Sequence, residues 1–112
     1  MSLNSKILEL PSIKETLIKN RIYPKKSLGQ NFILDLNITN KIAKAIKCHQ
    51  KNIIEVGPGP GSLTRSILNY GANSVIAVEK DLKMIKCLTD LKKISGNRLT
   101  LINRDILSLS LD

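Results

Sequence analysis

The feature that most constrains this chain is a glycine- and proline-rich turn placed between a short apolar run and a helical pattern. The turn reads Gly57-Pro58-Gly59-Pro60-Gly61 and directly follows the β-branched run 52–56, which is typical of a buried strand. Ser62 can cap a helix that ends at Gly71. Glycines at such a turn let a ligand approach the backbone, and the start of a helix attracts anionic groups. Strand, turn and helix together predict a loop that binds an adenosine-containing cofactor.

Two more strands are predicted further along the chain, at 74–79 and 99–103, with a helix from 81 to about 91 between them. The run 75–78 is continuously apolar, which favours a parallel strand covered on both faces. The order strand–helix–strand–helix–strand corresponds to half of a doubly wound α/β sheet. Residues 51–112 are therefore predicted to form three parallel strands with their helices, which is the first half of a Rossmann-like domain.

The first fifty residues have a different pattern, which predicts a basic helical extension. Ser12 and Glu15 have the spacing of a capping box, and the helix they begin is expected to end at Tyr23-Pro24. A second helix is expected to begin near 35–37 and to bury one apolar face, made of Ile38, Ile42, Ala45 and Ile46. We therefore divide the chain into a helical extension and lid segment, 1–50, and the first half of an α/β domain, 51–112.

Charge and composition limit the possible classes of protein. The 112 residues carry a net charge of +9, with nine basic and three acidic residues (+6) up to residue 50 and nine and six (+3) after it. Such an excess attracts a phosphate backbone, although a solvated basic face would have the same composition. One His and two distant Cys cannot build a four-ligand zinc site, so no metal is expected. The sequence has neither a secretory signal nor the roughly 20 apolar residues of a membrane span, so a soluble, cytoplasmic protein is expected.

The spacing of the turn narrows the choice of cofactor. The dinucleotide fingerprint places a third glycine where this chain has Ser62, which disfavours NAD and FAD, and no Gly-Lys-Ser/Thr follows to make a Walker loop. Glu79 ends the second strand and can accept hydrogen bonds from both hydroxyls of a ribose. Asp105 ends the third strand, where it can accept from an adenine amino group or act as a turn residue.

Four motifs carry a family resemblance: Lys26-Ser27-Leu28-Gly29-Gln30-Asn31-Phe32, the segment from Glu55 to Thr64, Val78-Glu79-Lys80-Asp81, and Asn103-Arg104-Asp105. With these motifs the chain resembles the S-adenosylmethionine-dependent ribosomal RNA adenine dimethyltransferases. The resemblance implies that S-adenosylmethionine is the cofactor. Gln30 and Asn31 would close over it, and Glu79 would hold its ribose. Glu55 would lie near the ammonium group of the cofactor, and Asp105 would lie at its adenine. Gly57, Gly59 and Gly61 would pass beneath its methionine part. Lys80 is a further cofactor residue that the resemblance implies.

The resemblance also implies a substrate, namely two adjacent adenosines near the 3′ end of small-subunit ribosomal RNA, each dimethylated on N6. Arg21, Lys25 and Lys26 are candidates for contacts with RNA phosphates. The family binds the target amine with an Asn-(Ile/Leu)-Pro-(Tyr/Phe) motif after a fourth strand, and these 112 residues contain no such motif. We therefore expect the chain to bind cofactor at most and not to catalyse alone. We also expect marginal stability or self-association through the unpaired edge of its first strand, whereas the parent protein would be a monomer.

Two other functions fit the same residues. One is a non-catalytic RNA-binding or ribosome-assembly module that keeps the methyltransferase fold and the basic extension. The other is a methyltransferase with a different substrate, which the Gly29-Gln30-Asn31-Phe32 element disfavours because methyltransferases in general share the glycine loop and the acid but not this segment.

Overall fold

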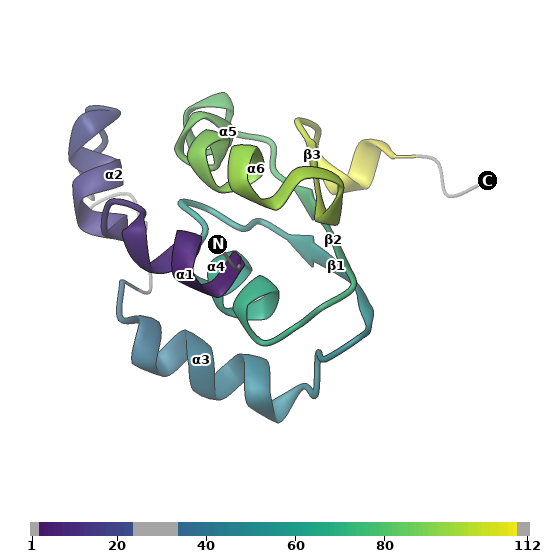
Figure 1. Cartoon of the computed structure of the whole chain (residues 1–112). Coiled ribbons are helices and arrows are strands. Elements are labelled where there is room, and N and C mark those ends of the chain that lie inside the picture. The colour runs from purple at the N-terminus through teal and green to yellow at the C-terminus, as the bar shows by residue number, and fades with distance from the viewer. Residues whose placement is uncertain (1–2, 24–33, 110–112) are drawn as a thin grey trace.

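Three parallel strands in the order β1-β2-β3 form the sheet, in a computed structural model that describes residues 3–23 and 34–109 (Figure 1). They are β1 (Asn52–Val56), β2 (Ser74–Val78) and β3 (Leu99–Ile102). Ile54 lies opposite Ile76, which in turn lies opposite Thr100. The three strands and their parallel arrangement confirm the fold class predicted from the sequence.

The described residues contain six helices, which lie on one face of this sheet. They are α1 (Leu3–Glu9), α2 (Ile13–Lys19), α3 (Leu36–Ala45), α4 (Ser62–Asn69), α5 (Leu82–Cys87) and α6 (Thr89–Ser95). Short 3₁₀ turns follow at Gly96–Arg98 and Ile106–Ser108. The expected single helix from 81 to about 91 is in fact two, because the chain breaks at Leu88, which is the C-cap of α5 and the N-cap of α6.

Side-chain caps fix where several helices begin. Ser12 Oγ accepts from the backbone N–H of Glu15 at 3.0 Å, as the capping-box spacing predicts. The carboxylates of Asp35 and Asp81 do the same for α3 and α5. The helix that Ser12 begins ends at Lys19, earlier than the expected Tyr23, because Asn20 is its C-cap and the next residue, Arg21, has a φ of 58° that no helix continues.

The main hydrophobic core lies between one face of the sheet and helices α1, α3, α4 and α6. Val75, Ala77 and Leu99 contribute from the strands, and all three are fully buried. Ile67 and Leu68 of α4 pack against them together with Leu88 and Leu91. Burial of these side chains is the dominant contribution to the stability of the sheet.

In the described residues most of the opposite face of the sheet is exposed, although Val78 on that face is buried, so the expectation of strands covered on both faces is wrong for most of this face. Ile54 and Val56 are 66% and 56% exposed, and Ile76 on the central strand is 37% exposed. A continuously apolar strand indicates that both faces can be buried, but it does not show which elements are present to bury them. In the described residues the helices of the core pack on one face only.

The buried face of α3 also differs from the expected one. Ile38 and Ile46 are 48% and 43% exposed, while Thr39 and Ala43 are completely buried. The reason is a polar contact with α4, since Thr39 Oγ1 and Ser66 Oγ lie 2.7 Å apart and Ser66 Oγ donates to Asn40 Oδ1 at 2.6 Å. Small hydrogen-bonding side chains let the two helices approach closely, which a count of apolar residues could not predict.

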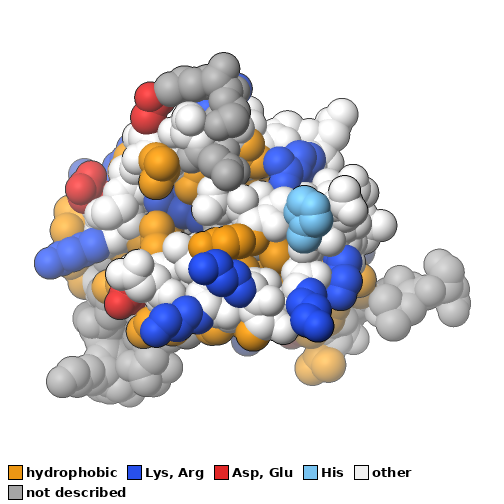
Figure 2. Space-filling view, turned by 60° about the horizontal axis from the view of Figure 1, so that its bottom comes forward, with side chains coloured by type: hydrophobic (Ala, Val, Ile, Leu, Met, Phe, Trp, Pro, Cys, Tyr) orange, Lys and Arg blue, Asp and Glu red, His pale blue; other side chains and the backbone are white. Residues whose placement is uncertain are grey.

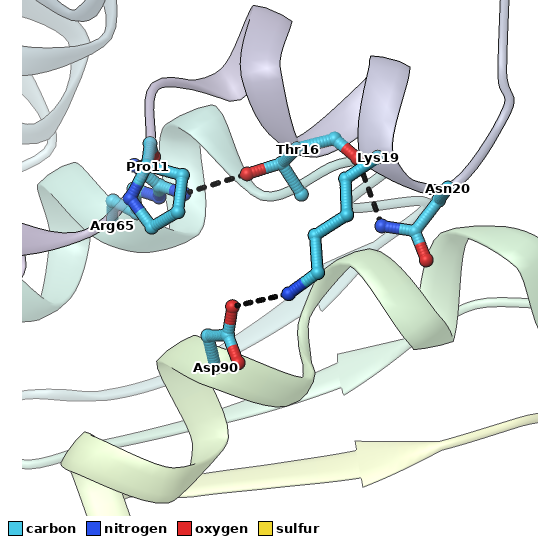
Figure 3. A network of polar contacts seen from close by, with 6 residues as sticks. All are labelled: Pro11, Thr16, Lys19, Asn20, Arg65 and Asp90. Atoms are coloured by element: carbon cyan, nitrogen blue, oxygen red, sulfur yellow. Dashed lines mark hydrogen bonds and ion pairs between the residues drawn. The ribbon is translucent and has the colours of Figure 1, made fainter.

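The N-terminal helices are joined to the sheet layer by a buried arginine and a second apolar cluster. Arg65 of α4 donates from Nη1 to the carbonyl of Pro11 at 2.8 Å and from Nη2 to Thr16 Oγ1 at 3.5 Å (Figure 3). Burial lowers the pKa of Arg65, and the nearby Asp90 opposes that shift. Beside this network, α2 packs on α5 through a cluster made of Ile13, Leu17, Ile22, Met84 and Cys87.

Candidate cofactor-binding site

The carboxyl ends of β1 and β2 lie side by side, and the glycine loop crosses directly above them. Val56 is paired with Val78, and the next backbone N–H, that of Gly57, donates to the carbonyl of Val78 at 2.8 Å. Gly57, Gly59 and Gly61 have φ values of 68°, 57° and 97°. These values lie in the left-handed region that favours glycine, so the conformation of the loop requires the glycines that the sequence supplies.

Gly61 also has a steric reason to be glycine. A Cβ at this position would lie 2.5 Å from Cδ2 of the buried Leu88. At Gly57, by contrast, a Cβ would meet no atom within 4 Å. The loop is therefore packed against the core where it enters α4 and open where it leaves β1, as a loop that receives a ligand should be.

Glu79 connects the loop to the end of β2. Its carboxylate is buried, with Oε1 accepting from the N–H of Gly59 at 3.1 Å and Oε2 accepting from the N–H of Asp81 at 2.9 Å. Asn103, just after β3, donates from Nδ2 to the carbonyl of Glu79 at 2.9 Å. A carboxylate has about four acceptor positions. Glu79 can therefore hold the loop and still accept hydrogen bonds from the hydroxyls of a ribose.

Glu55 lies on β1 immediately below the loop, where the sequence places it. Its Oε1 accepts a hydrogen bond of 2.6 Å from Thr64 Oγ1 on α4. Burial raises the pKa of Glu55, and the hydrogen bond from Thr64 lowers it by a smaller amount. Thr64 has no predicted role from the sequence, although it is the last residue of the motif Glu55–Thr64 that contains the glycine loop.

The remaining site residues fall into two groups. Asp105 is exposed, and its Oδ1 accepts from the N–H of Leu107 at 2.9 Å, so it caps the turn Ile106–Ser108; its contact with an adenine stays a prediction. Lys80 and Arg21 are exposed as well. Gln30, Asn31, Lys25 and Lys26 lie outside the residues that the structure describes.

The comparison with protein families decides which family this arrangement represents. A family model described as ribosomal RNA adenine dimethylase matches residues 22–112. The chain belongs to the ribosomal RNA adenine dimethylase family. The ribosomal RNA small subunit methyltransferases A of Ruegeria pomeroyi and Afipia carboxidovorans are 42% and 44% identical to it over 106 and 102 residues. These alignments cover 94% and 90% of this chain, and the chain spans only 38% and 36% of the length of the two relatives.

Solved structures support the same fold. The 23S rRNA methyltransferase ErmE superposes with a TM-score of 0.58 and 28% identity, over 73% of this chain and 33% of its own. The tRNA (m1A58) methyltransferase TrmI of Aquifex aeolicus superposes with a TM-score of 0.59 over 89% of this chain and 39% of its own, at 21% identity, which supports the fold alone. The fold is therefore the Rossmann-like fold of S-adenosylmethionine-dependent methyltransferases.

The residues at the strand ends fit S-adenosylmethionine. Its ribose offers two hydroxyl donors, and its methionine part offers an ammonium donor and needs a close approach to the backbone. Glu79 and Glu55 place two carboxylates at the ends of neighbouring strands, which is the chemistry that such donors need, and the glycine loop presents open backbone at Gly57. In the described residues no group of three or more His, Cys, Asp and Glu could hold a metal ion, and no helix there could cross a membrane.

Proposed function

We propose that this chain carries the cofactor-binding part of a methyltransferase that dimethylates N6 of two adjacent adenosines near the 3′ end of small-subunit ribosomal RNA. The observation that carries the proposal is the glycine loop held against Glu79 at the ends of two parallel strands. The family of the chain, and relatives whose name includes the small ribosomal subunit, support the choice of substrate.

In this proposal the residues of the chain bind and orient the cofactor. Glu79 accepts from both ribose hydroxyls, while Glu55 accepts from the ammonium group at the start of the glycine loop. S-adenosylmethionine supplies an electrophilic methyl group on its sulfonium, so the protein needs mainly to align an amine with that methyl. Gln30, Asn31, Lys80 and Asp105 complete the cofactor site in the proposal. We divide the chain here as in the sequence, with 1–50 as extension and lid and 51–112 as the start of the cofactor domain.

The amine-binding Asn-Leu-Pro-Tyr-like motif is not among these 112 residues. We therefore propose that the chain binds S-adenosylmethionine but transfers no methyl group alone, and that the complete enzyme acts in the cytoplasm on immature small subunits.

A basic surface supports RNA as the partner. From Leu36 to Ile54 the chain has four lysines and no acidic residue, and all four lysines are exposed. Figure 2 shows the face on which these blue side chains gather, over α3 and the segment that leads into β1. Lys44 also lies 5.3 Å from the ring centroid of Tyr70. We propose that this surface, together with Arg21, Lys25 and Lys26, binds the phosphates of ribosomal RNA.

The same surface favours one alternative, a non-catalytic RNA-binding or ribosome-assembly module. Calorimetry with S-adenosylmethionine separates the two functions, because the module needs no cofactor. We expect saturable binding of one cofactor per chain. RNA binding without any cofactor binding, by this chain and by the full-length relative alike, would refute the methyltransferase proposal in favour of the module.

A further inference from the structure

Thr64 forms a contact that the proposed binding of the cofactor does not yet use. Its side chain is completely buried in the first turn of α4, and Oγ1 donates to Glu55 Oε1 at 2.6 Å. Hydroxyl-to-carboxylate bonds of 2.5–2.7 Å are the short, strong kind that form when the acceptor is ionised. The contact joins the helix that follows the glycine loop to the strand that precedes it.

Glu79 and Arg65, two charged residues of the neighbouring elements, bond to groups other than Glu55. Lys51 directly precedes β1 and is exposed, whereas Glu79 directly follows β2 and Arg65 lies on α4. The carboxylate of Glu79 accepts from Gly59 and Asp81, and the guanidinium of Arg65 donates to Pro11 and Thr16. The ionisation of Glu55 is thus determined by two opposing causes, burial and the Thr64 hydroxyl.

We propose that Thr64 is a positioning residue for the cofactor: its hydroxyl holds Glu55 ionised and oriented so that the carboxylate accepts the cofactor ammonium. This inference rests on the proposed function, since it needs a ligand with a cationic amine. An ionised Glu55 attracts that amine, whereas a protonated one must give up its proton before it can form the same pair.

The sign of the pH dependence follows from the two causes. Burial raises the pKa of Glu55 above its ordinary value, so protonation begins at a higher pH than for an exposed glutamate. Affinity for the cofactor should therefore fall as the pH drops through that pKa. Removing the Thr64 hydroxyl removes the cause that lowers the pKa of Glu55, so the acidic limb of the affinity profile should move to higher pH.

The test compares three single variants. Thr64→Val removes the hydroxyl at nearly constant volume, and Thr64→Ser restores it. Thr39→Val is the matched control, because Thr39 is equally buried and its hydroxyl bonds to Ser66 rather than to a carboxylate. The first measurement is the titration of the Glu55 carboxyl by carbon-13 NMR in the ligand-free protein, with Glu55→Gln to assign the signal. We expect a higher pKa in Thr64→Val, and the wild-type pKa in Thr64→Ser and Thr39→Val.

The second measurement is the dissociation constant of S-adenosylmethionine between about pH 4.5 and pH 8. On the acidic limb, affinity should be about tenfold lower in Thr64→Val, since loss of the hydrogen bond to the ionised carboxylate favours the protonated form of Glu55. Methylthioadenosine, which lacks the ammonium, should bind wild type and Thr64→Val equally.

Two outcomes would overturn the role of Thr64: an unchanged titration of Glu55 in Thr64→Val, or an equal loss of affinity at every pH and for both ligands. Absence of S-adenosylmethionine binding at every pH, by the wild-type chain and by the full-length protein alike, would instead overturn the proposed function, and the NMR titration distinguishes the two failures.

Discussion

The two ends of the parallel strands differ in charge; we call the end at which the strands begin the amino edge of the sheet and the end at which they finish its carboxyl edge. At the carboxyl edge, where the strands end, acidic side chains outnumber the two basic ones, Lys80 and Arg104; the acids are Glu55, Glu79, Asp81 and Asp105. At the amino edge, Lys51 directly precedes β1 and Arg98 directly precedes β3, and no acidic residue lies between Leu36 and Ile54. Parallel strands all begin at one edge and end at the other, so a sequence with bases before β1 and β3 and an excess of acids after the strands produces this polarity.

The edges differ equally in how their charges are held. The carboxylates accept hydrogen bonds from backbone N–H groups or from Thr64, so they have fixed orientations before any ligand arrives. The lysines of the amino side are exposed. The ion pair that the described residues contain joins Lys19 on α2 to Asp90 on α6, away from these lysines. Fixed acceptors suit recognition of one small ligand with defined donors, whereas exposed lysines suit a flexible phosphate chain.

The largest expected effect is at the carboxyl edge. Glu79→Ala removes the acceptor that holds the N–H of Gly59 and, in the proposed site, two hydrogen bonds to the ribose, so we expect S-adenosylmethionine affinity to fall about a hundredfold. Calorimetry measures the dissociation constant. Asp90→Ala is the control, because Asp90 is an acid on α6 and not at the strand ends, and it should leave the constant unchanged. A change within twofold in Glu79→Ala would contradict the assignment of the ribose.

The next largest effect is on stability, and it distinguishes a cation that bonds to backbone carbonyls, Arg98, from an exposed one, Lys51. Arg98 donates from Nη2 to the carbonyls of Leu68 and Ala72 at 3.0 and 2.7 Å, which fixes the end of α4. Arg98→Met keeps the apolar stem but leaves both carbonyls unpaired, so the free energy of unfolding should fall by about 2 kcal/mol. Urea denaturation measures it, with Lys51→Met as the control that should change little. Equal losses would mean that Lys51 has a structural role too.

The elements of the carboxyl edge could be predicted from the sequence because their signals are local. A β-branched run stopped by glycine, a turn of three glycines and an acid after the next strand each identify themselves within a few residues. The exposure of Ile54 and Ile76, and the burial of Thr39 in place of Ile38, depend on which elements pack against them. Those partners are distant in sequence, and hydrophobicity alone does not name them.

The basic surface gives a smaller expected effect, on RNA affinity. Three lysines without acidic neighbours in sequence are neutralised together: Lys44→Gln, Lys47→Gln and Lys51→Gln. The matched control neutralises three lysines on α5 and α6, close to Asp81 and Asp90: Lys83→Gln, Lys86→Gln and Lys93→Gln. We expect the first variant to bind a labelled RNA hairpin about tenfold more weakly, and the slope of log affinity against log salt to fall by about 2, at about 0.7 for each lost phosphate contact.

Fluorescence anisotropy at several salt concentrations measures both quantities, and calorimetry should find cofactor affinity unchanged in both variants. If the control variant loses as much RNA affinity as the first, the overall charge of the protein attracts RNA and the polarity between the edges has no part in it.

The smallest effect concerns the uncovered face, which belongs to neither edge. Ile54 is 66% exposed there, while the adjacent Ile53 packs against the core on the other face. Ile54→Thr should therefore change the free energy of unfolding by less than about 0.5 kcal/mol and leave RNA affinity within twofold, whereas Ile53→Thr should be clearly destabilising. If copies of the chain associate through β1, as the sequence predicts, sedimentation should find less dimer in Ile54→Thr. Unchanged association would mean that the backbone edge alone, or another surface, joins the copies.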